Sequence, residues 1–219
     1  MIVFPVSQAE IHDTWHVSGL EGTGSCDFSV SGLFVPNDFT VDMRIWEPKR
    51  GGPLYQLGRP GLVINELAGF ALGVARRALD TILDLANTKC RGYGKQRMLA
   101  EREVFQRAIG EADLRLRAAR GLAIESFEKA WQTVCDGRKP GPKLQVELRS
   151  VTTLVTDVAL DVTALAFRYG AGSAIHLGSI LQRCVRDLQA GAAHLMVSDV
   201  AYELHGQCLL GIADVDPMG

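Results

Sequence analysis

The residue of this sequence best suited to chemistry is a histidine in an apolar segment near the C-terminus. Steps of four and three from Asp187 within residues 180–210 reach a run of polar and small residues: Gly191, His194, Ser198, Ala201 and His205. If the segment is one helix, this run forms a single face, and the small residues predict a cavity beside His194. An imidazole there could exchange a proton with a bound phenol or peroxide. Alternatively, His194 makes only a structural hydrogen bond to a neighbouring helix.

Three other motifs have both a functional and a structural interpretation. Arg186 and Asp187 face about 100° apart on a helix, so they should pair with different neighbours, most simply as an interhelical ion pair. GAGS at residues 170–173 lacks the spacing of a phosphate-binding loop and also fits a helix end. KCRGYGKQR at residues 89–97 could meet a cofactor diphosphate or form a solvated turn.

Composition and missing motifs exclude several classes of protein. The chain has 219 residues, 47% of them hydrophobic, and a net charge of -2 without charged blocks, which argues against a nucleic-acid partner. With no apolar run of about 18 residues and no leader-like start, we expect no membrane partner and a cytoplasmic location. The five cysteines include no CxxC pair, and the histidines show no metal spacing, so we expect reduced, mostly buried thiols and no metal site.

Four amphipathic segments predict how these residues are positioned. Apolar residues recur at spacings of three and four in residues 61–89, 96–136, 143–169 and 180–210, separated by loops rich in Gly and Pro. The sequence is therefore expected to be mainly α, an antiparallel up-down four-helix bundle. The second helix would have about 40 residues and a length of about 60 Å. Unless it breaks near Gly110, its apolar overhang needs other copies of the chain to cover it.

The N-terminal residues have a different texture. MIVFP, DTWHVSG and CDFSVSGLFVP read as short strands separated by turns, yet two or three strands do not make a stable sheet. Residues 47–60, EPKRGGPLYQLGRP, read as a connector. We therefore divide the chain into strands at 1–46, a linker at 47–60 and a helical domain at 61–219.

Two stretches of this sequence resemble one family. DTWHVSGLEGTGSCDFSVSGLFVP at residues 13–36 resembles the closing strands of the middle β domain of the acyl-CoA dehydrogenase superfamily, and LQRCVRDLQAGAAH at residues 181–194 resembles the last helix of its C-terminal four-helix domain. The resemblance covers essentially the whole chain. It implies a short β remnant of a truncated middle domain, a flavin cofactor (FAD or FMN) and assembly into a homotetramer, or a dimer.

The resemblance also implies roles for particular residues. AAHLMVSD at residues 192–199 replaces the glutamate-containing YEGT stretch of the dehydrogenases, which resembles the flavin-dependent monooxygenase branch and implies that His194 lies near flavin and substrate. By position in the family, three residues would contact the flavin diphosphate and adenosine in a neighbouring subunit: Arg91, Tyr93 and Gln106. Gly170 and Gly172 match the family's glycine-rich loop.

The family therefore implies a flavin-dependent oxidoreductase. Its chemistry would be acyl-CoA dehydrogenase-like or that of a two-component flavin monooxygenase, the latter served by a flavin reductase. The alternative is a non-catalytic oligomerising helical module with an incomplete flavin site. Because the family's isoalloxazine-binding strands would precede residue 1, whether this chain alone binds flavin and is active stays open.

Overall fold

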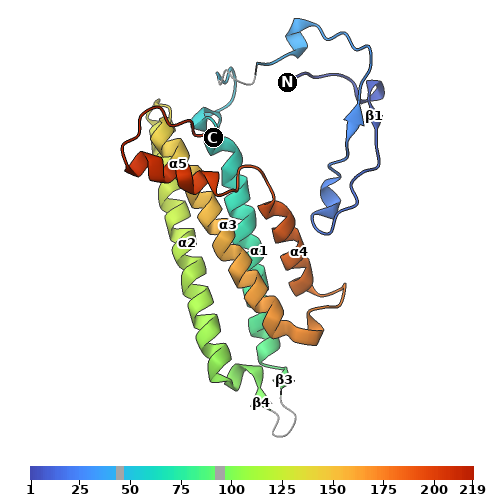
Figure 1. Cartoon of the computed structure of the whole chain (residues 1–219), viewed down its shortest axis with the longest axis vertical. Coiled ribbons are helices and arrows are strands. Elements are labelled where there is room, and N and C mark those ends of the chain that lie inside the picture. Colours follow the sequence, from blue (N-terminus) through green and yellow to red (C-terminus); the bar gives the residue numbers. More distant parts are fainter. Residues whose placement is uncertain (43–46, 92–96) are drawn as a thin grey trace.

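Four long helices pack lengthwise, and a fifth lies across one end of them (Figure 1). The computed structural model describes residues 1–42, 47–91 and 97–219. Its helices are α1 (Gly61–Ala86), α2 (Glu103–Cys135), α3 (Pro142–Gly170), α4 (Ile180–Ala192) and α5 (Val200–Leu209). The predicted fold class, a mainly α up-down four-helix bundle, is confirmed. Turn residues end the elements where expected, since Gly137 takes the left-handed conformation after α2 and Pro142 opens α3.

The core of the bundle is built on small residues of α1 and on α3. The face of α1 that points inward is fully buried and rich in alanine: Ala68, Ala71, Ala75, Ala78, Leu79 and Ile82. Small side chains let helix axes approach closely, and α3 packs against all three other long helices. Taken alone, α3 is long and apolar enough to span a membrane, but 61% of its most apolar window is buried among the other helices. Such burial is typical of the central helix of a bundle.

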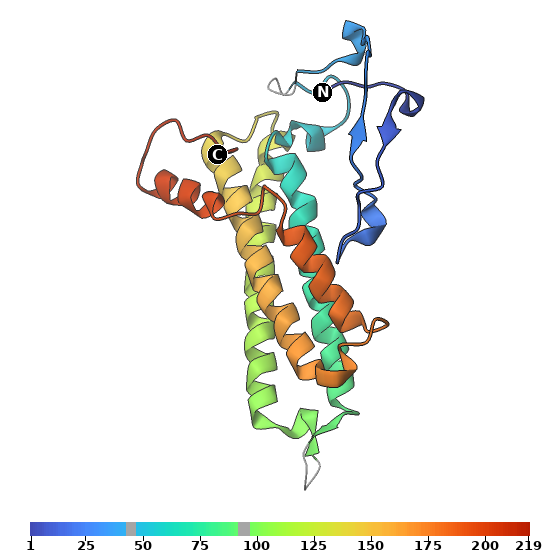
Figure 2. The ribbon, with the colours of Figure 1, turned by 45° about the vertical axis from the view of Figure 1, so that its right-hand side comes forward.

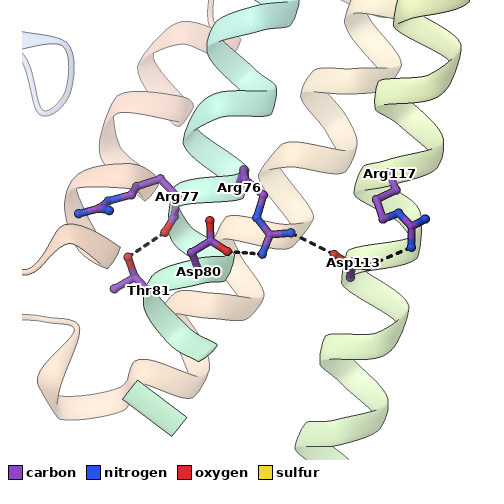
Figure 3. A network of polar contacts seen from close by, with 6 residues as sticks. All are labelled: Arg76, Arg77, Asp80, Thr81, Asp113 and Arg117. Atoms are coloured by element: carbon purple, nitrogen blue, oxygen red, sulfur yellow. Dashed lines mark hydrogen bonds and ion pairs between the residues drawn. The ribbon is translucent and has the colours of Figure 1, made fainter. Parts of the chain in front are cut away.

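Charged side chains link α1 to α2 along one outer face of the bundle. Arg76 donates to Asp113 across the two helices at 3.0 Å and also to Asp80, one turn along α1 (Figure 3). Arg117 approaches the second oxygen of Asp113 at 3.7 Å. Burial lowers the pKa of Arg76 less than the two carboxylates raise it, so the pKa lies above its ordinary value.

The N-terminal segment contains much less regular structure than its sequence predicts. Strands β1 (Glu10–Ile11) and β2 (Phe28–Ser29) form a two-residue antiparallel ladder. Within residues 1–42, only Gly19 is buried. The expected strand DTWHVSG is wrong, because a strand needs a neighbour to take up its backbone groups and this stretch finds none in the described part of the chain.

The second and fourth predicted helices need correction. α2 has 33 residues and begins at Glu103, after strand β4 (Arg97–Met98), while residues 92–96 lie outside the described part of the chain. It is continuous through Gly110 and about 50 Å long. Because the 29-residue α3 runs beside it, the expected overhang is wrong. The fourth segment is broken into α4 and α5.

The connector is fastened to the bundle. Leu57, in the 3-10 turn Pro53–Leu57, is buried, and its carbonyl accepts a hydrogen bond from the side-chain amide of Gln145 on α3. The oxygen of the same amide accepts a hydrogen bond from the Gly61 N–H at 2.7 Å, at the start of α1. One buried glutamine therefore fixes where the connector ends and the first long helix begins. The division into three parts stays a prediction.

Candidate functional site

His194 lies in the turn between α4 and α5, with its side chain exposed. The Met196 N–H donates to His194 Nδ1 at 3.2 Å, and the Val197 N–H donates to the His194 carbonyl at 2.8 Å. A ring nitrogen that accepts a hydrogen bond carries no proton, so the neutral ring holds its proton on Nε2. In the described part of the chain no residue pairs with Nε2. The imidazole is therefore arranged to donate a hydrogen bond to an oxygen atom outside its own turn.

The predicted polar face through Asp187, His194 and His205 is wrong, because these residues do not share one helix. Asp187 lies on α4 and His205 on α5, with His194 in the turn between. In a continuing helix the carbonyls of Leu195 and Met196 would accept from N–H groups four residues ahead. Here both carbonyls accept from Arg149 of α3, at 3.4 and 3.2 Å. A side chain on another helix thus donates to the two carbonyls that a continuous helix would have paired with its own N–H groups.

Gly191, one turn before His194, is used for packing. A Cβ at Gly191 would lie 2.5 Å from an edge atom of the Phe70 ring on α1. The absence of a side chain lets α1 and α4 approach closely. The small residues of this stretch therefore do not leave the cavity that the sequence suggested at this position.

Arg186 and Asp187 hold the N-terminal segment against α4. Asp187 Oδ1 accepts a hydrogen bond from the Leu20 N–H at 2.8 Å, while Arg186 Nη1 donates to the Ser18 carbonyl at 2.8 Å and approaches Glu21 at 3.2 Å. The two side chains have different partners, as expected, but an interhelical ion pair was the wrong expectation. In Figure 2 the tip of the N-terminal segment reaches α4.

The close approach of this loop depends on Gly19. A Cβ at Gly19 would lie 2.1 Å from the Arg186 carbonyl oxygen, a distance that no side chain tolerates. A cavity of about 340 Å³ lies between residues 20–23 and the α4 side chains Arg183, Arg186 and Asp187. The loop and α4 thus enclose one cavity between them.

The glycine-rich loop ends α3, as the structural interpretation predicted. A Cβ at Gly170 would lie 2.6 Å from Leu181 Cδ1 and 2.7 Å from Ala174 Cβ, so this glycine lets the chain fold back closely. The Lys89 ammonium donates to the Gly170 carbonyl and to Ser173 Oγ. Around Gly172 a Cβ would meet nothing within 4 Å, so this position is open to solvent or to a ligand.

Gln106 and strand β3 (Cys90–Arg91) lie far from His194 (Figure 1). Gln106 is exposed on α2, and its amide donates to the Ala100 carbonyl at 2.9 Å. The backbone of Arg91 is in strand β3 (Cys90–Arg91), whereas the Tyr93 prediction lies outside the described residues. β3 and β4 lie at the lower end of the bundle in Figure 1, and the α4–α5 turn lies toward its upper end. A single chain therefore does not bring His194 together with Gln106 or strand β3.

The chain matches one protein family over more than half of its length. The profile described as "Acyl-CoA dehydrogenase, C-terminal domain" matches residues 66–199. This range begins in α1 and ends just before α5, so it contains most of α1, all of α2, α3 and α4, and the His194 turn.

The proteins similar to this chain include oxygenases. The indole-3-acetate monooxygenase of Pseudomonas putida is 32% identical over 211 residues, which are 96% of this chain and 54% of that protein. A Rhizobium protein described as "FADH(2)-dependent resorcinol hydroxylase, oxygenase component" is 26% identical, over 96% of this chain and 56% of its own length. XiaF from Streptomyces sp., solved in complex with FADH2 and glycerol, shares the fold with a TM-score of 0.88 at 19% identity, over 98% of this chain and 56% of its own. The chain spans about half the length of the relatives that it matches.

Proposed function

The chain belongs to the acyl-CoA dehydrogenase family through its C-terminal helical domain, and on this premise we propose that it forms the helical part of a flavin-dependent monooxygenase. The proposed reaction is hydroxylation of a small aromatic molecule. This substrate class is supported by relatives whose descriptions name indole-3-acetate and resorcinol. The chain corresponds to about half of those proteins. The proposal therefore concerns what we call the assembled enzyme, which is the oligomer of this chain together with a part equivalent to the other half of the relatives.

One observation carries the choice of oxygenation over dehydrogenation. Desaturation of an acyl thioester needs a base that removes a proton next to the carbonyl group. His194 presents Nε2–H outward, while its Nδ1 is engaged by the Met196 N–H. In this form the outward nitrogen already carries a proton, so it offers a substrate a hydrogen-bond donor and not a base. A donor at this position suits the stabilisation of negative charge on an oxygen atom at the reaction centre.

A flavin is the cofactor that we propose for this site. When bound, a reduced flavin supplies the electrons that activate oxygen. The chain offers His194 in the α4–α5 turn, and Gly172, with its open surroundings, in the 3-10 turn Ala171–Ser173 at the other end of α4. We propose that the two ends serve flavins in different copies of the chain, with Gln106 and Arg91 near the adenosine or phosphate part. FAD suits this span better than FMN because only FAD has an adenosine group.

We propose that the chain assembles into a homotetramer, and the exposed apolar side chains of the bundle support contact with another copy. A cavity of about 410 Å³ between α1 and α2 is lined mostly by apolar residues, among them Leu72, Ile124, Phe127 and Trp131. Ile124 is 50% exposed and Trp131 is 40% exposed, an unfavourable state for large apolar side chains in water. We propose that another copy covers this face. Trp131→Glu should lower the sedimentation coefficient, whereas Gln132→Glu, on the same helix and exposed, should leave it unchanged.

We propose a separate flavin reductase as a further partner. The Rhizobium relative is described as an oxygenase component, a term that implies a second component supplying reduced flavin. Oxygen consumption measured with chemically reduced flavin should match that measured with a reductase and a nicotinamide donor. A rate that depends on one particular reductase would point to direct contact between the two proteins.

Flavin titration tests the proposed function directly. Reduced and oxidised FAD and FMN are titrated into the chain under anaerobic conditions, and fluorescence anisotropy is followed. Saturable binding of reduced flavin and hydroxylation of an aromatic acid or phenol by the assembled enzyme are expected. His194→Ala should abolish most hydroxylation while the oligomer persists, and His176→Ala, in an exposed loop, should have no effect. An oligomer that binds no flavin would instead establish the non-catalytic helical module.

A further inference from the structure

Arg149 is a buried arginine whose partners are all backbone carbonyls. It lies on α3 and is only 3% exposed. Nε donates to the Met196 carbonyl at 3.2 Å and Nη2 to the Leu195 carbonyl at 3.4 Å. Nη1 donates to the carbonyls of Pro217 and Met218 at 3.1 and 2.7 Å. One guanidinium therefore joins the turn that carries His194 to the C-terminal residues.

Burying a charged side chain in this way costs folding free energy, which a residue that only fills space would not require. Charged side chains are rarely this buried without a carboxylate partner, and no described carboxylate lies within ion-pair distance of Arg149. Burial lowers the pKa of the guanidinium, and the more distant charge of Asp216 opposes this only in part. An apolar side chain of similar volume would fill the same space without that cost. The planar fork of the guanidinium instead fixes the directions of several carbonyls at once.

The contact with Leu195 acts on His194 through one peptide unit. The Leu195 carbonyl and the Met196 N–H belong to the same planar trans peptide, so they point in opposite directions. Arg149 Nη2 donates to the carbonyl at 3.4 Å, with Ser198 Oγ as a longer second donor at 3.5 Å, and holds it on one side of the C–N bond. The N–H is thereby directed to the other side, where it donates to His194 Nδ1 at 3.2 Å. Without a fixed carbonyl this peptide could rotate, and Nδ1 would lose its donor.

We propose that Arg149 is a positioning residue for His194, which holds the imidazole as the Nε2–H form by fixing the peptide between Leu195 and Met196. This inference rests on the proposed function of His194 as a hydrogen-bond donor. It adds a residue from the centre of the bundle that touches neither substrate nor cofactor. Residues 143–169 also contain Glu147, Asp157 and Asp161, so the sequence alone did not single out Arg149.

The test reads the histidine ring itself. In the full chain with ¹⁵N-labelled histidine, long-range ¹H–¹⁵N spectra at a pH where the ring is neutral should show His194 as the Nε2–H tautomer. Arg149→Lys keeps a positive charge but cannot hold both pairs of carbonyls, so His194 should populate both tautomers and the Met196 amide should exchange at least tenfold faster. Arg120→Lys, on the exposed side of α2, is the matched control and should change neither signal.

Several outcomes would overturn the inference. A folded Arg149→Lys variant in which His194 stays entirely Nε2–H would show that the arginine only stabilises the bundle. If that variant does not fold, a wild-type spectrum with the proton on Nδ1 would be equally decisive. A chain ending at Val215 removes the acceptors of Nη1 and the charge of Asp216 but leaves the acceptors of Nε and Nη2, and it should keep the Nε2–H form. Loss of that form in the shortened chain would assign the control of the ring to the tail.

The proposal about the His194 tautomer and the proposal about its function can be refuted independently. If His194→Ala leaves hydroxylation unchanged, the proposed function of the histidine is wrong, yet the spectra still measure whether Arg149 fixes the ring. If both hold, Arg149→Lys should lower kcat of the assembled enzyme with little change in KM. Such a split is expected when a group that acts in the transition state is misplaced while substrate binding is intact.

Discussion

The helical bundle and the N-terminal segment of this chain differ in how far each completes its own structure. The bundle buries a continuous apolar cluster contributed by all four long helices. In residues 1–42 only Gly19 is buried, and Phe34 is 84% exposed. A helix satisfies its backbone groups internally and needs only one covered face, whereas a strand needs at least one neighbouring strand to pair with. The segment is therefore held mainly by the short loop that Arg186 and Asp187 fasten to α4.

The largest expected effect contrasts the two regions with one truncation in each. Ile82→Ala, at a fully buried position of α1, should cost about 3 kcal/mol of unfolding free energy, because it removes methyl groups from a filled core. Phe34→Ala should cost less than about 0.5 kcal/mol, since that ring already lies in solvent. Urea unfolding followed by circular dichroism measures both. A cost for Phe34→Ala as large as that for Ile82→Ala would mean that the segment is covered in solution.

A substitution at the joint between the regions should have the next largest effect. Gly19→Ala places a methyl group against the Arg186 carbonyl, so the loop should leave α4 and lose contacts worth about 2 kcal/mol. Hydrogen exchange of the Leu20 amide, which Asp187 now protects, should accelerate toward its rate in an unfolded chain. Gly22→Ala is the control, because a Cβ there meets nothing within 4 Å. Unchanged Leu20 protection in Gly19→Ala would contradict the docking described for this loop.

The charged contacts on the outside of the bundle should matter less. Arg76→Ala removes the links to Asp80 and Asp113 and should cost about 0.5–1 kcal/mol, because these side chains are partly exposed and screened by water. The loss should shrink at an ionic strength of about 1 M. Arg77→Ala is the control, since its side chain points away from Asp113 in Figure 3. A cost above about 2 kcal/mol would show that the network is less exposed in the assembly than in the single chain.

Thiol labelling compares the regions without destabilising either. Cys184 on α4 is 7% exposed, and burial raises the pKa of its thiol, so the reactive thiolate is scarce at neutral pH. It should react with a disulfide reagent only when the bundle unfolds, and sooner as the pH rises. Cys26 in the N-terminal segment is half-buried and should react within the native state. Mass spectrometry of the labelled peptides distinguishes the two cysteines. Equal protection of both would contradict the difference in burial between the bundle and the N-terminal segment.

The same labelling addresses an expectation about the other cysteines that is wrong. The sequence suggested mostly buried thiols, but Cys90 and Cys135 are exposed and only Cys184 is buried. Cys135 is the last residue of α2 and Cys90 is the first residue of β3. At such ends the chain turns at the surface, so even an apolar side chain becomes exposed. These two thiols should react first.

The sequence by itself determined the elements whose order is set by local periodicity. Apolar spacing in residues 61–89 and 143–169 matched α1 and α3 closely, and glycine and proline marked the ends of the long helices. Both are local properties, because the helical hydrogen bond reaches only four residues. The same reasoning correctly predicted different partners for Arg186 and Asp187, although it could not find them 165 residues or more away in the chain.

Only the tertiary structure decided the surroundings of His194. The local pattern continues through residues 180–210 as one helix, but Arg149, on another helix, takes up the carbonyls that this helix would have needed. A periodic sequence specifies which face of a helix is apolar, whereas it does not specify which distant donor competes for the backbone. The break between α4 and α5, and with it the direction of the imidazole, follows from that competition and therefore from packing.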